Sequence, residues 1–192
     1  MTTVPLRKDA ARNWHRILEV GRGLVDEGAP IQLNDVARAA SVGVATVYRH
    51  FPTPEALVET IAGPGIEALI EHAESALPES APDRDESWAA LRDFLFAGVD
   101  AQARDASLQP VFAAPRSALP RTAELKERLA ARYGELFDRA RAAGAVDPGV
   151  AREDLVPLMC GVIFAASVHP TADRAATARR YLAVLLDGVR RR

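Results

Sequence analysis

Four side chains that form strong hydrogen bonds lie within five consecutive positions of this chain. Thr46, Tyr48, Arg49 and His50 contribute two hydroxyls, a guanidinium and an imidazole, and the apolar Val47 stands between them. These groups bind phosphate oxygens, and a guanidinium also pairs with the O6 and N7 atoms of guanine. Taken without their surroundings, the same residues would be the rim of an ordinary amphipathic helix. The segment that carries them decides between the two interpretations.

Catalytic chemistry is the alternative for the other reactive side chains. His15, His72 and His169 lie near carboxylates in the sequence, but none has the spacing of a zinc-binding H-E-x-x-H motif or of a facial triad. Cys160 lies in an apolar run, and no Gly-rich phosphate loop is present. The sequence therefore predicts no cofactor and no metal, and a helical enzyme stays only as an alternative.

Composition limits the class of protein. The chain has 192 residues, 48% of them hydrophobic, and a net charge of −2, which argues against coating nucleic acid with the whole surface but permits a local basic face. A single cysteine excludes an internal disulfide and a thiolate zinc site. No apolar run is long enough to cross a membrane and no signal-peptide core is visible, so we expect a soluble, cytoplasmic protein without a membrane partner.

The elements that must position these groups are helices. Ala, Leu, Arg and Glu are abundant, and no alternating run predicts a strand, so we expect an all-α protein. Three prolines in 108–120 favour only short or irregular helix there. The predicted helices cover residues 14–27, 33–40, 44–51, 54–62, 66–77, 88–103, 122–143, 154–168 and 175–189.

Glycine, proline and capping residues predict where these helices begin and end. Gly63-Pro64-Gly65 should break or sharply kink the chain after the fourth helix, and the Pro-rich segment 78–86 should be a loop. Thr53 and Pro54 are typical of an N-cap and a first turn. Asp154 is expected to cap the eighth helix, which would put Pro157 in its first turn.

Residues 33–51 have the layout of a helix-turn-helix. Two short helices flank the tight turn Ser41-Val42-Gly43, and the second helix of such a motif enters the major groove of DNA. The small core that joins the two helices is predicted to consist of Val36, Ala37, Val42, Val47 and Phe51.

The run T-V-Y-R-H-F at 46–51, followed by E-A-L at 55–57, resembles the DNA-binding domain of the TetR family of transcriptional regulators. The resemblance extends over residues 17–61, and the ending ARRYLAVLLDGVR, 178–190, is similar to the last helix of family members. It implies an N-terminal three-helix helix-turn-helix domain, residues 1–62, and a larger helical domain for ligand binding and dimerisation, residues 66–192.

The resemblance also implies which residues meet DNA. Those at the positions of Thr46, Tyr48 and His50 bind phosphates or lie against the groove wall. The positions of Val44, Ala45 and Arg49 approach base edges, and Arg49 is the best candidate for reading a guanine. Two further candidates for DNA contact are Thr53 and Lys8. Lys8 belongs to a basic segment at the entry to the first helix, and the alternative interpretation of this segment is a solvated tail without a DNA contact.

Two departures from the family pattern change the details. The family has Gly-Val-Ser where this chain has Ser41-Val42-Gly43, so Ser41 is expected at a positive φ and Gly43 at the N-cap. A non-glycine residue in that conformation costs on the order of 1 kcal/mol. Pro54 replaces a common Lys or Arg, which removes one expected phosphate contact.

The C-terminal part is expected to bind a small apolar or aromatic effector and to form a homodimer, because the matching helices do so in the family. The predicted effector-pocket residues are Trp88, Phe94, Leu95, Phe112, Tyr133, Phe137, Met159 and Phe164. The predicted dimer contacts are Leu158, Val162, Tyr181, Leu182 and Leu185.

A dimer presents two recognition helices, so the DNA partner is predicted to be an inverted-repeat operator. We expect a repressor that an effector releases from this operator. A helix-turn-helix regulator without a ligand and a purely structural helical partner are the remaining alternatives.

Overall fold

The computed structural model describes residues 4–77, 83–169 and 173–191, and their side chains from Asp9 onward. Within these ranges nine α-helices form and the only β-type pairing is one isolated bridge, between Val146 and Arg190, which confirms the predicted all-α class. The helices are α1 Val4–Asp26, α2 Leu33–Ala39, α3 Val44–His50, α4 Pro54–Ala76, α5 Arg84–Arg104, α6 Leu108–Ala113, α7 Pro120–Ala142, α8 Arg152–Val168 and α9 Arg174–Val189.

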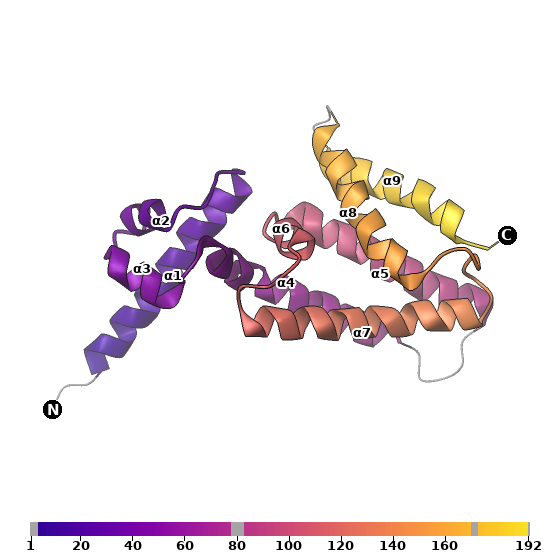
Figure 1. The fold of residues 1–192 in the computed structure, drawn as a ribbon, viewed down its shortest axis with the longest axis horizontal. Coiled ribbons are helices and arrows are strands. Elements are labelled where there is room, and N and C mark those ends of the chain that lie inside the picture. The colour runs from indigo at the N-terminus through magenta and orange to yellow at the C-terminus, as the bar shows by residue number, and fades with distance from the viewer. Residues whose placement is uncertain (1–3, 78–82, 170–172, 192) are drawn as a thin grey trace.

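Helices α1, α2 and α3 form a small head at one end of the molecule (Figure 1). Its apolar residues recur at helical spacing on each element, and they meet in one cluster with the first turns of α4. Four of the five residues predicted for this core are buried, and Val42 is half-buried at its edge. The cluster contains Ile17, Leu33, Val36, Ala37, Ala40, Val47, Phe51, Leu57 and Ile61.

Helix α4 connects this head to the rest of the molecule without interruption. Of the two outcomes predicted at Gly63-Pro64-Gly65, a break or a sharp kink, the break is wrong, because Pro64 lies inside one continuous helix. Proline removes a helical hydrogen bond and costs about 3 kcal/mol. Packing on both sides offsets that cost, because Ala62 and Ile66 are buried against α6 and α7.

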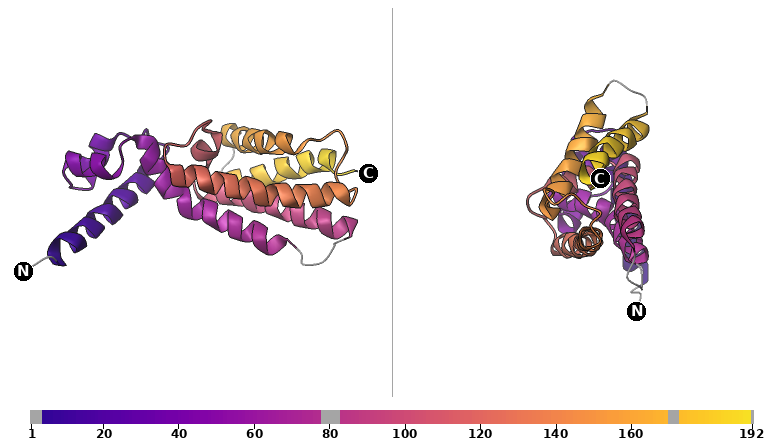
Figure 2. Two further views of the ribbon diagram at one scale, coloured as in Figure 1. Left: turned by 60° about the horizontal axis from the view of Figure 1, so that its bottom comes forward. Right: turned by 90° about the vertical axis from the view of Figure 1, so that its right-hand side faces the viewer.

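Helices α5 to α9 form the larger body. Figure 2 shows the long helices α4, α5 and α7 running side by side, with α8 and α9 packed on α5 and α8 also on α7. Their shared core reaches from Ala73 on α4 to Val189 near the end of α9. The predicted short helix within 108–120 is confirmed as α6.

Helices α1 and α5 begin earlier in the chain than the sequence patterns predicted. Helix α1 begins at Val4, ten residues before the predicted start at Trp14. Residues 78–82 of the predicted loop lie outside the described ranges, while 84–86 are already helical. There the side chain of Asp83 accepts a hydrogen bond from the Glu86 amide at 2.8 Å, and Glu86 accepts one from the Asp83 amide at 3.1 Å.

Asp154 is not the N-cap of α8, so that prediction is wrong. Helix α8 begins at Arg152, and the Asp154 carboxylate reaches back to accept a hydrogen bond from the Ala151 amide at 2.9 Å. Pro157 consequently lies in the second turn rather than the first. Pro157 is exposed and has no N–H to donate to the backbone carbonyl one turn earlier. Water can donate a hydrogen bond to that carbonyl instead.

No helix in the described ranges combines the length and the apolar character needed to cross a lipid bilayer.

Candidate nucleic-acid interface and ligand cavity

Helix α3 turns Tyr48 and Arg49 away from the core of the head. Val47 is fully buried, whereas Val44 and Tyr48 are 47% and 46% exposed. Ala45 and Arg49 are also exposed, because the positions two residues before and two residues after Val47 lie on the opposite side of the helix. The structure thus brings together Val44, Ala45, Tyr48 and Arg49 as one outward surface, which we call the α3 outer face.

Arg49 is the cationic residue of the α3 outer face. Its guanidinium has no carboxylate within ion-pair distance in the described part of the chain. Arg38 on α2, in contrast, is paired with Asp35 at 2.6 Å. A planar cation without a partner is suited to bidentate contact with a guanine edge or a phosphate.

Thr46 and His50 lie at the rim of α3 and are half-buried. The His50 ring packs edge-on against Trp14 of α1 with 5.4 Å between ring centroids. Its Nε2 atom is buried and has no hydrogen-bond partner among the described residues. A phosphate contact from His50 would therefore have to use Nδ1. The sequence patterns did not indicate the contact with Trp14.

The turn before α3 has the conformation expected from its exchanged residues. Ser41 has a φ of 53°, the one non-glycine residue with positive φ in the described ranges, and Gly43 is the N-cap. Backbone hydrogen bonds from the Ser41 amide to Arg38 O, 3.1 Å, and from the Val42 amide to Ala37 O, 3.0 Å, close the turn. These contacts offset the strain at Ser41.

Thr53 is the N-cap of α4 and follows the end of α3 by three residues. Thr53 is exposed, and its hydroxyl oxygen accepts a hydrogen bond from the Ala56 amide at 3.2 Å, which confirms its predicted capping role. The hydroxyl proton stays available to a phosphate. The side chain of Lys8 lies outside the described residues.

A partly open cavity of about 220 Å³ lies in the body. Five of the predicted pocket residues line it: Phe94, Leu95, Phe112, Tyr133 and Met159. The other lining residues were not predicted as pocket residues: Leu69, Gly98, Gln102, Lys126, Leu129, Ala130, Val156 and Cys160. None of these eight residues is aromatic, whereas three of the first five are.

Three predicted pocket residues lie elsewhere. Phe137 is fully buried in the body core. Trp88 is also core, with the Arg190 guanidinium 5.7 Å above its ring. Phe164 is 62% exposed on the surface of α8. Helical spacing placed all three on apolar faces, but it does not distinguish core, cavity wall and open surface.

Tyr133 closes one side of the cavity. Its hydroxyl donates a hydrogen bond to the backbone oxygen of Arg152 at 2.9 Å, which ties α7 to the start of α8. Burial raises the pKa of the phenol well above its ordinary value, so the hydroxyl remains a donor at any physiological pH.

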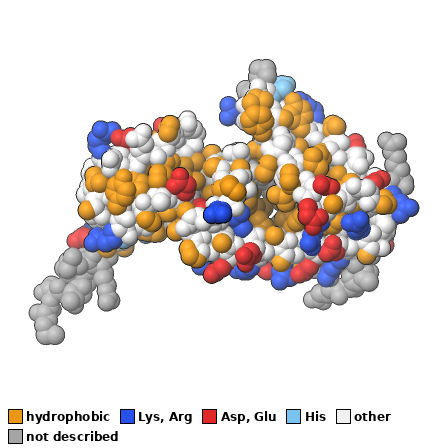
Figure 3. Space-filling view, viewed as in Figure 1, with side chains coloured by type: hydrophobic (Ala, Val, Ile, Leu, Met, Phe, Trp, Pro, Cys, Tyr) orange, Lys and Arg blue, Asp and Glu red, His pale blue; other side chains and the backbone are white. Residues whose placement is uncertain are grey.

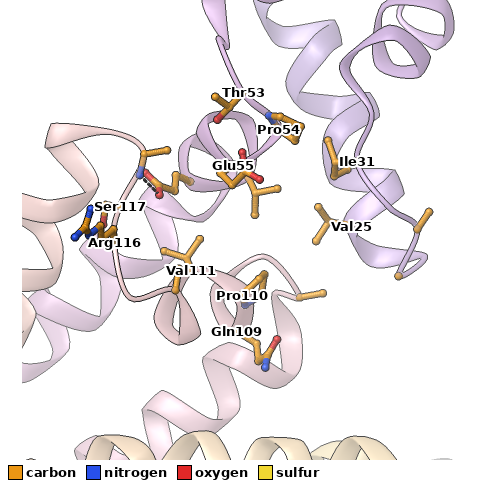
Figure 4. A pocket seen from close by; sticks show the side chains of 17 residues that line it. Val25, Ile31, Thr53, Pro54, Glu55, Gln109, Pro110, Val111, Arg116 and Ser117 are labelled. Carbon is orange, nitrogen blue, oxygen red and sulfur yellow. Dashed lines mark hydrogen bonds between the residues drawn. The ribbon is translucent and has the colours of Figure 1, made fainter.

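A larger open groove, about 730 Å³, lies between the head and the body (Figure 4). Val25 and Ile31 line its head side, and Pro110 and Val111 of α6 line its body side. At its edge the buried carboxylate of Glu59 accepts hydrogen bonds from the amides of Ala118 and Leu119, at 2.6 and 2.8 Å.

The predicted dimer residues divide into two sets. Val162 and Leu182 are buried within the protomer, 8% and 0% exposed, so their side chains cannot form a partner surface without repacking the core. Leu158 is 41% exposed, and Tyr181 and Leu185 are half-buried. Figure 3 shows hydrophobic side chains gathered over α8 and α9. The most exposed large apolar residues of these helices, the α8/α9 apolar face, are Val156, Leu158, Phe164, Val168 and Val184.

Metal chemistry has no candidate site here: within the described ranges, no group of three or more His, Cys, Asp or Glu side chains is arranged to hold an ion.

Two family models match the chain. Residues 18–61 match the model described as bacterial regulatory proteins of the tetR family. Residues 86–191, more than half of the chain, match the model described as the C-terminal domain of SbtR-like transcriptional regulators. The first match runs from within α1 to within α4, and the second runs from the first turn of α5 to the end of α9.

Relatives and solved structures agree with these matches. The HTH-type transcriptional regulator SAR0097 from Staphylococcus aureus is 31% identical over 94 residues, which are 46% of this chain and 49% of that protein, so this chain spans about half of that relative's length. The TetR transcriptional regulator SCO0520 from Streptomyces coelicolor is 27% identical with a TM-score of 0.54, covering 92% of this chain and 97% of that one. The fold is also shared with FadR from Bacillus subtilis, solved in complex with stearoyl-CoA, at 15% identity and a TM-score of 0.61, covering 92% of this chain and 99% of FadR.

Proposed function

The chain belongs to the TetR family of transcriptional regulators, and from that premise we propose that it is a dimeric repressor that leaves an inverted-repeat operator when a small apolar or aromatic effector binds. Family membership assigns the chain to regulators rather than to enzymes. The observation that carries the proposal is the α3 outer face, where an unpaired Arg49 stands beside exposed Tyr48 on the second helix of a helix-turn-helix.

The α8/α9 apolar face supports the dimer. Phe164, Val168 and Val184 are 62%, 64% and 69% exposed, and large apolar side chains clustered at this exposure mark interaction surfaces. A two-fold axis through this face would present two α3 helices to successive major grooves, about 34–36 Å apart.

Contacts between head and body support the release. Arg22 of α1 donates a hydrogen bond to the backbone oxygen of Ile61 on α4 at 3.0 Å and approaches the Asp105 carboxylate at 3.4 Å. An effector that favours one packing of the body therefore changes the position of the head, and it weakens DNA binding by its differential affinity for the two states.

Selection of bound sequences from random DNA with the purified protein tests the proposal. An inverted repeat is the expected result. Recovery of no preferred sequence at low salt would contradict DNA recognition, and a preferred single half-site would contradict the dimer.

Changing Arg49 to alanine is expected to weaken binding to the selected operator by roughly 10- to 100-fold and to relax the preference at one base position in each half-site. Tyr48→Phe is expected to weaken all sequences alike, because a phosphate contact carries no sequence information. Titrations with operator variants measure both effects.

Arg92→Ala is the matched control for Arg49, because it removes one arginine from the body that is paired with Asp93 at 2.8 Å. Its operator affinity should stay within about twofold of wild type. A uniform loss for Arg49→Ala with a base-specific loss for Tyr48→Phe would reverse the assigned roles.

Changing Phe164 to aspartate is expected to weaken the dimer at least about 100-fold, because the symmetry buries two unpaired carboxylates in one apolar interface. Sedimentation velocity at micromolar protein should then show a monomer, with affinity for the full operator falling toward that for a half-site. Ala131→Asp puts the same charge on an exposed position of α7 and should leave the dimer intact. A Phe164→Asp protein that stays dimeric would move the interface elsewhere.

A further inference from the structure

The cavity in the body has the size of a small cyclic ligand. Its volume is about 220 Å³, and an apolar cavity of about 150 Å³ already holds benzene. The walls from α4 to α8 are mainly aliphatic and aromatic, including Leu69, Phe94 and Phe112. A single ring with a short substituent fills this space.

Lys126 is the one charged side chain among the described residues that line the cavity. Its ammonium donates hydrogen bonds to the backbone oxygens of Val111, at 3.1 Å, and Ala114, at 3.0 Å. An ammonium has three donors, so one is left.

The environment of Lys126 differs from that of its neighbours on α7. Arg128 approaches Glu74 at 3.9 Å, and Arg132 is paired with Glu135 at 2.7 Å. Lys126 has no carboxylate within ion-pair distance in the part of the chain that the structure describes, although it is half-buried. A partly desolvated cation without a counter-charge attracts an anion, and a single ammonium balances a single negative charge.

Tyr133 and Gln102 are less suited than Lys126 to bind a carboxylate, because both are neutral. The hydroxyl of Tyr133 is already donated to Arg152 O. The Gln102 amide donates to Gly98 O at 3.4 Å, and its buried Oε1 has no hydrogen-bond partner among the described residues. That oxygen accepts hydrogen bonds and would favour a ligand with an N–H or O–H group. Lys126 therefore favours an acid, whereas Gln102 favours a neutral amide or alcohol.

We propose that the effector is a small aromatic or cyclic monocarboxylate, and that its carboxylate binds the ammonium of Lys126. This inference rests on the proposed function, since it names the chemical class of that effector. A charge-assisted bond to a carboxylate is stronger than a bond to a neutral carbonyl, so Lys126 dominates over Gln102.

The position of Lys126 also links the ligand to the head. The two carbonyls that Lys126 holds belong to the end of α6 and the residue after it, while Pro110 and Val111 of the same helix line the groove between head and body (Figure 4). A carboxylate that draws the ammonium into the cavity weakens its hold on the end of α6. The wall of the groove then loosens on the side that faces the head.

Calorimetric titration of the 192-residue chain with benzoate, phenylacetate and phenylpropionate, each beside its neutral amide, tests this inference. We expect at least one acid to bind at least 10-fold more tightly than its amide and to lower operator affinity. Lys126→Met should remove the preference for the acid while the amide still binds, which shows that the cavity is intact. Lys126→Arg should restore part of the preference.

Arg128→Met is the matched control, because it removes a cation two residues away on the same helix that does not line the cavity. It should keep the preference for the acid. The inference is overturned if the wild-type protein binds none of the acids, binds acid and amide equally, or keeps its preference in Lys126→Met.

The two proposals fail separately. A protein that selects an operator but ignores the acids contradicts only the effector class. A protein that binds an acid through Lys126 but selects no DNA sequence contradicts the proposed regulator and leaves the cavity assignment standing.

Discussion

Phe51→Ala is expected to destabilise the head by about 3–5 kcal/mol and to abolish operator binding. Phe51 is 1% exposed, and its ring stacks on Trp14 with 4.6 Å between centroids, so truncation leaves a cavity where α1, α3 and α4 meet. A loss of this size approaches the whole stability of a small domain. Helix α3 has only seven residues, too few to stay folded without tertiary packing.

Hydrogen exchange measures this effect where it arises. The amides of α3 and of the first turns of α4 should exchange at least about 100-fold faster in Phe51→Ala, while those of α7 stay protected. Tyr48→Ala is the control, because it removes an aromatic side chain that is 46% exposed on the same helix. Its stability should change by less than about 1 kcal/mol. Unchanged exchange in Phe51→Ala would show that another contact holds the head together.

Glu59→Ala is expected to destabilise the protein by about 2–4 kcal/mol and to release the segment that precedes α7. Glu59 is 4% exposed, and its two carboxylate oxygens accept the amides of Ala118 and Leu119. Removing the carboxylate leaves both amides without their acceptor. Because Ala118 is exposed, water replaces part of the loss, and the effect stays below that of a fully buried charge pair.

Glu59→Ala also tests the coupling between effector binding and operator affinity, because Glu59 lies at the edge of the groove between head and body. Glu59 ties the segment after α6 to the helix that carries the head, so its loss should reduce the response of operator affinity to an effector. Denaturant unfolding measures the stability change, and Glu59→Gln, which keeps one acceptor, should lose less than half as much. Glu55→Ala, exposed one turn earlier on α4, should change stability by less than about 1 kcal/mol. Equal losses for Glu55 and Glu59 would contradict the role of the buried carboxylate.

The head is the part of the molecule that its sequence predicts best. The contacts between α2 and α3 are close in the chain, so the spacing of Val36, Ala37, Val47 and Phe51 is enough to place them in one core. The conformation of Ser41 followed from its place in the turn. The roles of Arg49 and Tyr48 on DNA stay predictions.

Errors concentrate where helices distant in the sequence meet. Gly63-Pro64-Gly65 carries a strong local signal for a break, yet packing against α6 and α7 keeps α4 continuous. Val162 and Leu182 have the spacing of an interface and are instead core of the protomer. Local propensity is worth about 1–3 kcal/mol at such sites, and tertiary burial exceeds it.

The sequence by itself determined the all-α class, the helix-turn-helix head and the apolar face of each helix, because these depend on residue type and on a period of 3.6 residues. Only the tertiary structure decided what covers each face: core for Phe137, cavity for Phe94, open surface for Phe164. It also decided that Glu59 meets a segment about 60 residues away, and that Lys126 stands at a cavity without a carboxylate partner in the described ranges. Periodicity shows that a side chain is apolar or charged and on which side it lies, but partners from distant helices determine what that side chain does.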